Sequence, residues 1–159
     1  MAVAVLTVVQ APTARGAGSW YVSNSGSDGV GCGSSGAPCG TLQYAVGLAS
    51  AGDTIYVAAG TFTGVGPNVV TVTKSLVLSG GWNPSFTTQS GVTLIDGQNA
   101  RRGIQVNANA ATTVISLTVA NGFVNTGPIT GGGGILTSSP IVLTDVTLKD
   151  NASLGGGGG

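Results

Sequence analysis

The chain has 159 residues, of which 29 are glycine, and its formal net charge is zero with only 6% charged side chains. It contains no histidine and no glutamate. A nucleic-acid surface needs clustered lysine and arginine, so this composition argues against a nucleic-acid partner. A hydrophobic content of 42% argues against a disordered chain. The mixture of Val, Ile, Thr, Ser and Gly is typical of many short strands joined by tight turns.

The N-terminus begins with an apolar run, residues 1–9, which is too short to span a bilayer because that needs about 20 residues. Ala14 and Gly16 are small residues at the two positions that a signal peptidase reads. We therefore expect residues 1–16 to be a signal peptide cleaved before Ala17. The usual positive charge at its start is missing, which suggests a signal clipped at the front. A first strand of the fold is the alternative.

Cys32 and Cys39 are the only cysteines, and both lie in a loop of Gly, Ser and Pro. Two cysteines without histidine are poor support for a metal site. In a secreted chain, we expect them to form a short-loop disulfide. Two unpaired thiols are the alternative.

One helix is predicted, at about residues 41–51, between a strand at Trp20–Ser23 and another that starts near Asp53. Thr41 is a good N-cap and Gly52 a good stop. Its apolar residues lie on one face: Leu42, Ala45, Val46 and Ala49. We expect residues 17–64 to form an N-terminal cap that covers one end of a stack of strands.

After Gly60 the chain consists of strand-like segments. They are residues 69–82, 92–97, 103–107, 113–122, 133–138 and 141–151. Residues 115–122 match residues 144–151 at an offset of 29, and the glycine runs at 131 and 155 repeat at an offset of 24. Strands that repeat at a short, loose period indicate a solenoid, in which each repeat buries its apolar face against its neighbours.

Within the repeat, apolar and small polar residues alternate. We expect Leu117 and Val119 to face the core, together with their counterparts Val146 and Leu148. Asp145 and Asp150 would then lie on one strand segment and face opposite ways.

Asn121 and Asn151 are expected at turns, where asparagine tolerates left-handed geometry and can stack in a hydrogen-bonded ladder. The last glycine run lacks the apolar residues that follow the earlier one. We therefore expect a truncated repeat whose strand edges are open to other chains.

Several segments resemble the start of secreted right-handed parallel β-helix proteins. They are YVSNSGSDG from Tyr21, CGTLQYAV from Cys39 and AGDTIYVAAGTFTG from Ala51. The later GGWNPSF, TLIDGQNARRGI and GGGGI…LTDVTLKDN are similar to the polymorphic outer-membrane and autotransporter-like branch of the pectate-lyase-like superfamily. The resemblance implies an all-β, right-handed parallel β-helix over residues 65–159, three-sided and covered at its N-terminal end by the short helix.

Asp96, Arg101 and Arg102 are the candidate catalytic residues. The resemblance to β-helix pectate lyases implies an Asp-bound calcium and an arginine or lysine base. However, calcium takes six to eight oxygens, and one aspartate is a thin site. Without histidine, a Ser-His or Cys-His nucleophilic site is absent. The favoured interpretation is structural: Asp96-Gly97 forms a tight turn, and the arginines are solvated at the edge of the next strand.

Trp82 and Phe86, in a polar loop, are the candidates for an exposed sugar-stacking patch, with loop-anchoring packing as the favoured alternative. We therefore expect a secreted or cell-surface (outer-membrane) structural or adhesive protein without cofactors. Its partner would be an extracellular polysaccharide or a host or cell-surface ligand. Any membrane attachment would come from a missing C-terminal anchor. The alternatives are a pectate-lyase-like enzyme with calcium, and a surface glycan-binding module. The scaffold alone does not choose among them.

Overall fold

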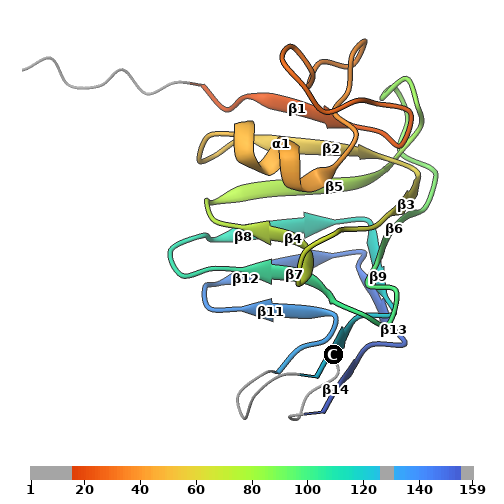
Figure 1. The fold of residues 1–159 in the computed structure, drawn as a ribbon. Helices are drawn as coiled ribbons and strands as arrows, with labels where there is room; N and C mark the ends of the chain where they lie inside the picture. The colour runs from red at the N-terminus through yellow and green to blue at the C-terminus, as the bar shows by residue number, and fades with distance from the viewer. Residues whose placement is uncertain (1–15, 126–130, 155–159) are drawn as a thin grey trace, which may run out of the picture.

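The computed structural model describes residues 16–125 and 131–154. Within these ranges the chain forms fourteen β-strands and one α-helix, and every pairing between the named strands is parallel. Figure 1 shows the strands layered from β1 at one end to β14 at the other, with α1 beside the first layers. The fold is therefore mainly β, as the composition predicted.

The strands form three main sheets and a short fourth one. In spatial order the first sheet contains β1 (Ser19–Val22), β2 (Thr54–Ala58), β5 (Leu76–Trp82), β8 (Thr112–Ile115) and β12 (Ile141–Thr144). The second contains β3 (Gly60–Phe62), β6 (Thr93–Asp96), β9 (Leu117–Ala120) and β13 (Thr147–Lys149). The third contains β4 (Asn68–Val72), β7 (Arg102–Val106) and β11 (Ile135–Thr137). The fourth contains β10 (Phe123–Val124) and β14 (Ala152–Ser153).

From β2 onward, the chain passes through the three main sheets in the same order, first, second and third, and then returns to the first. We call one such passage a circuit. Parallel neighbours need a long connection, and here the strands of the other two sheets supply it. Thr144 pairs with Ile115 and Thr147 with Thr118, an offset of 29 residues in both cases. The predicted match between residues 115–122 and 144–151 is confirmed. The glycine offset of 24 involves residues beyond those described.

The core lies between the sheets and is built from rows of aliphatic side chains that stack from one circuit to the next. In the first sheet, Ile55 pairs with Leu78 and Leu78 with Val114, and all three are fully buried. The other sheets contribute comparable rows, among them Ile95 with Val119 and Val70 with Ile104. Burying one such side chain contributes about 1.5–3 kcal/mol, so each added circuit stabilises its neighbour.

Single left-handed residues form the corners between strands. Ser116 and Asp145 have φ values of 51° and 52°, and Asn121 and Asp150 have 52° and 53°, each pair 29 residues apart. The prediction for Asn121 is confirmed, whereas Asp150 takes the corresponding position in the next circuit in place of Asn151. Asp145 and Asp150 flank β13 at its two turns, so the expectation that they share one strand is wrong.

Asn151 binds the preceding circuit instead of another asparagine. Its Oδ1 accepts from the Gly122 N–H at 2.8 Å, and its Nδ2 donates to the Val119 carbonyl at 3.0 Å. A Cβ on Gly134 would lie 2.7 Å from this Nδ2, and one on Gly122 would lie 2.1 Å from the Gly133 carbonyl oxygen. The glycine run therefore leaves room for the Asn151 amide. In place of the expected asparagine ladder, the Asn151 side chain bonds to backbone and Asn121 Nδ2 donates to Asp96 Oδ1.

The helix α1 (Leu42–Leu48) lies over the first circuit and is shorter than the sequence predicts. Thr41 caps it as expected, accepting from the Tyr44 N–H, and the four predicted core residues are at most 3% exposed. Gln43 Oε1 accepts from the Thr71 N–H on β4 at 2.8 Å. The C-terminal carbonyls of Gly47 and Ala49 accept from Lys74 Nζ, a favourable place for a cation. Helix and sheet are thus joined at both ends of the helix.

The other end of the described stack is uncovered. Leu143 and Leu148 are in register with the fully buried Val114 and Val119, but they are 43% and 38% exposed. Val146 is partly buried. Leu148 therefore has the core-facing register that the sequence predicts, and it is exposed because β12 and β13 are the last strands of their sheets in the described residues.

Candidate functional site

The first candidate, Asp96, ends β6 and begins a turn. Its Oδ1 accepts from the Gln98 N–H at 2.8 Å, which closes the turn that the Asp-Gly pair predicted. The same atom accepts from Asn121 Nδ2 at 2.9 Å, on the next circuit. The carboxylate therefore joins two successive corners of the stack.

Arg101 lies in the same turn and reaches back to the previous circuit. Its Nη1 donates to the Gly64 carbonyl and to Gln98 Oε1, the latter at 2.8 Å. Its Nε is buried without a hydrogen-bond partner. The side chain is half-buried and ties the loop after β6 to the loop after β3.

Arg102 is the first residue of β7 and is only 8% exposed. Its Nε donates to the Gly132 carbonyl at 2.9 Å, and its Nη1 donates to Asn68 Oδ1 at 3.0 Å and to Gln105 Oε1 at 2.9 Å. Burial lowers the pKa of the guanidinium from its ordinary value. The expectation of a solvated Arg102 is wrong, because the side chain lies between β4, β7 and the residues before β11. Sequence order alone does not show that these segments meet.

The three candidates lie close together in sequence, but each bonds to a different segment of the chain. Asp96 bonds toward Asn121, Arg101 toward Gly64, and Arg102 toward Gly132. An arginine can act as a base only if one of its nitrogens is free to take a proton from substrate. The contacts of Arg102 instead hold the guanidinium inside the stack, which supports the structural interpretation of this cluster.

Trp82 and Phe86 belong to a cluster of four half-buried aromatic residues on the outer face of the first sheet. We call Tyr21, Tyr56, Trp82 and Phe86 the aromatic row. Tyr21 and Tyr56 are in register on β1 and β2 and stack at a ring-centroid distance of 5.2 Å. Phe86 meets Tyr21 edge-on at 4.9 Å, and Trp82 meets Tyr56 edge-on at 5.2 Å. The predicted patch of Trp82 and Phe86 does not include the two tyrosines, although alternation around the buried Ile55 and Val57 places Tyr56 outside.

A bulge and a folded loop bring these rings together. The pairing of β2 with β5 shifts between Tyr56 and Ala58, so Trp82 lies beside Ala58. Gly81 adopts a φ of 78° in this bulge, which favours glycine. The following loop is held by Asn83, whose Oδ1 accepts from the Thr87 N–H at 2.9 Å. Phe86 thereby anchors the loop on Tyr21, as the packing alternative predicted.

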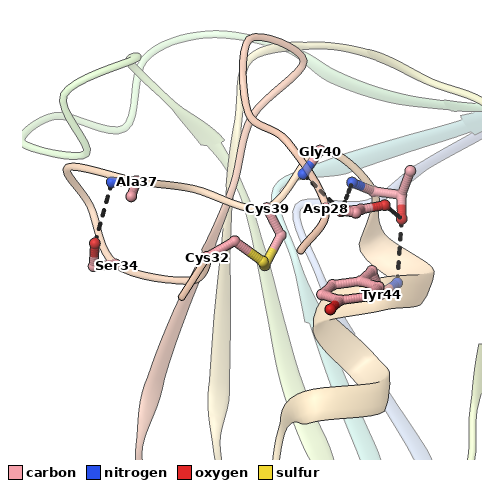
Figure 2. Close-up of a disulfide and its surroundings, with 8 residues drawn as sticks. Asp28, Cys32, Ser34, Ala37, Cys39, Gly40 and Tyr44 are labelled. Atoms are coloured by element: carbon pink, nitrogen blue, oxygen red, sulfur yellow. Dashed lines mark hydrogen bonds between the residues drawn. A yellow bond between two sulfur atoms is a disulfide. The ribbon is translucent and has the colours of Figure 1, made fainter. Parts of the chain in front are cut away.

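The predicted disulfide is present: Cys32 and Cys39 are bonded, and the alternative of two free thiols is wrong (Figure 2). Its loop covers the outer edge of β1, where Tyr21 N–H donates to the Gly33 carbonyl at 3.1 Å and Cys39 N–H donates to the Tyr21 carbonyl at 2.9 Å. Asp28 lies beside the disulfide and accepts from the N–H groups of Gly40 and Thr41 at 2.8 and 3.0 Å (Figure 2). These hydrogen bonds hold the disulfide loop to β1 and to the residues just before α1.

An apolar groove of about 730 Å³ separates α1 from residues 63–71. Tyr44, Leu48, Val65 and Val69 supply much of its wall. Its polar residues are already engaged, since Gln43 binds Thr71 and Asn68 binds Arg102. Asp28, the carboxylate in its wall, accepts from the Gly40 and Thr41 N–H groups.

Comparison with known proteins identifies no relative: no family model, curated protein or solved structure matches the chain. Among the described residues, no helix has the length and apolar character needed to cross a membrane.

Proposed function

We propose that the chain is a right-handed parallel β-helix that serves as a secreted or cell-surface structural or adhesive module. The support for the β-helix is the repeated circuit through three parallel sheets, together with the resemblance of the Tyr21–Gly64 segments to secreted β-helix proteins. The support for an oxidising compartment is the Cys32–Cys39 disulfide, since such bonds persist outside the reducing cytosol.

The observation that carries the non-catalytic role is the burial of Arg102 in the stack. Asp28, Asp53 and Asp96 also use their carboxylates to bind backbone or side-chain donors of other segments. A side chain that holds two segments of the fold together is poorly placed to move with a substrate. Arg102 and these three aspartates thus support a scaffold.

The pectate-lyase-like alternative makes a different prediction for the same chain. It requires calcium-dependent release of unsaturated products from polygalacturonate. We expect purified protein to release none, measured by ultraviolet absorbance with and without calcium. Calcium-dependent release would contradict the structural and adhesive role.

Secretion is tested separately by expressing the entire reading frame, with its own leader, in a bacterial host. We expect the protein outside the cytoplasm, beginning at Ala17, as shown by N-terminal sequencing. An unprocessed protein retained in the cytoplasm would contradict the secreted role.

A further inference from the structure

We propose that the aromatic row binds a neutral polysaccharide on the outer face of β1, β2 and β5. This inference rests on the proposed surface role, because it gives the adhesive module a ligand class and a site. The rings follow one another as Phe86, Tyr21, Tyr56 and Trp82, each 4.9–5.2 Å from the next between centroids. They form an elongated, half-exposed aromatic path instead of a closed core.

The rings of the aromatic row are held in place before any ligand binds. Trp82 is held by its Nε1–H, which donates to Ser79 Oγ at 3.0 Å. Gln89 also reaches Ser79 Oγ and donates to the Gly80 carbonyl at 2.7 Å, which fixes the returning end of the loop. Rings fixed by packing and hydrogen bonds lose little conformational entropy when a ligand binds. The contacts that anchor the loop therefore also prepare the surface.

The surface around the aromatic row is uncharged. The segments that build the surface, residues 17–23, 54–62 and 75–95, contain no Asp, Glu, Lys or Arg. Their exposed polar groups are hydroxyls and amides, such as those of Ser85, Thr87 and Gln89. An anionic polymer, an acidic peptide or a metal ion would find no complementary charge here. A sugar chain offers hydroxyl groups for such a rim and carbon–hydrogen faces for aromatic rings.

The area of the aromatic row is small compared with that of a protein interface. An aromatic side chain presents about 150–250 Å² in total, and these four are already half-buried. A stable protein interface needs about 800 Å² from each partner. The aromatic row is too small for that and is of a size for a short stretch of oligosaccharide. A glycan is thus favoured over a protein partner.

The test uses affinity electrophoresis of the whole protein in gels that contain a neutral polysaccharide: hydroxyethyl cellulose, xylan, glucomannan or soluble starch. We expect retardation in at least one of them. Tyr56→Leu and Phe86→Leu should each weaken that binding by roughly tenfold or more, because leucine keeps the apolar area but removes the ring. Tyr56→Phe should retain binding. Tyr44→Leu is the matched control, since Tyr44 lies on α1 away from the row.

Thermal melting of each variant shows whether it is folded, and Phe86→Leu changes only a loop, so at least one ring can be removed without altering a strand. No retardation in any neutral gel, or equal binding by the leucine variants, would overturn the glycan site. A polygalacturonate gel with calcium runs in parallel. Product release in the polygalacturonate gel would contradict the proposed non-catalytic function. If no product is released there and no neutral gel retards the protein, only the glycan-binding inference is overturned.

Discussion

Asn151 accepts a hydrogen bond from the backbone N–H of Gly122, 29 residues earlier in the chain, at 2.8 Å. This bond and the one from Asn151 Nδ2 to Val119 join the last described circuit to the one before it. Asn151→Ala removes both and leaves partly buried backbone groups unsatisfied. We expect the free energy of unfolding to fall by about 1–3 kcal/mol, measured by urea denaturation.

Asn125→Ala is the matched control, because Asn125 is exposed in the same part of the fold. Its substitution should change stability by less than about 0.5 kcal/mol. Equal stability of the two variants would show that the Asn151 amide contributes nothing to the joining of circuits.

Asp53 is 5% exposed and holds the start of β1 against the turn after α1. Its carboxylate accepts from Gly18 N–H at 2.6 Å, Trp20 Nε1–H at 2.9 Å and Ser50 N–H at 2.8 Å. We expect Asp53→Ala to lower the unfolding free energy by about 3 kcal/mol, because three donors to a charged acceptor lose their partner. Trp20 fluorescence in urea reports it. Asp150→Asn, at an exposed corner where asparagine is tolerated, should be close to neutral.

Arg102 is predicted to be a stabilising residue whose guanidinium shape matters. Arg102→Lys keeps a positive charge but cannot donate in the same directions to Gly132, Asn68 and Gln105. We expect a loss of about 2 kcal/mol or more in urea denaturation, consistent with an unmade buried hydrogen bond to a charged group. The reverse exchange at an exposed site, Lys149→Arg, should have little effect. If Arg102→Lys is as stable in urea as the unaltered protein, Arg102 is again a candidate for contact with a substrate.

Reduction of the Cys32–Cys39 disulfide should loosen the cap more than the rest of the stack. A loop of this length contributes about 2–3 kcal/mol in the chain-entropy account. Hydrogen exchange measured by mass spectrometry should show faster exchange of the Tyr21 N–H, which donates to Gly33 in the same loop. The amides of β9 should stay protected. Equally faster exchange at Tyr21 and in β9 would show that the disulfide loop stabilises the whole fold and not only the cap.

Local signals predicted much of this architecture. The Thr41 cap, the buried face of α1 and the match between residues 115–122 and 144–151 depend on neighbours in sequence, and the structure confirms them. Burial at the last strands was not predictable from alternation. Leu148 has the pattern of an inward residue, but its exposure depends on whether another strand covers it.

The candidate site was less accessible to sequence reasoning because its contacts join different circuits. Circuit lengths vary: β5 precedes β8 by 36 residues in register, whereas β6 precedes β9 by 24. Without a fixed period, nothing in the sequence places Arg102 against Gly132, or Phe86 on Tyr21. The bulge at Gly81 has the same effect, since it shifts Trp82 relative to β2. The neutrality of the aromatic row, in contrast, could be read from the sequence.

Every site described above depends on the stacking of successive circuits, and β9 and β13 allow a direct test because they stack at a 29-residue offset. Thr118 and Thr147 are outward-facing neighbours on β9 and β13, so their Cα atoms lie about 4.8 Å apart, within reach of a disulfide. Thr118 and Lys149 face the same way but are shifted by two residues, about 8 Å apart and beyond that reach. We predict that the double variant Thr118→Cys/Thr147→Cys forms this cross-link on mild oxidation, identified by peptide mass spectrometry, and that Thr118→Cys/Lys149→Cys does not. No cross-link in the first pair, or equal cross-linking in both, would contradict the stacked arrangement.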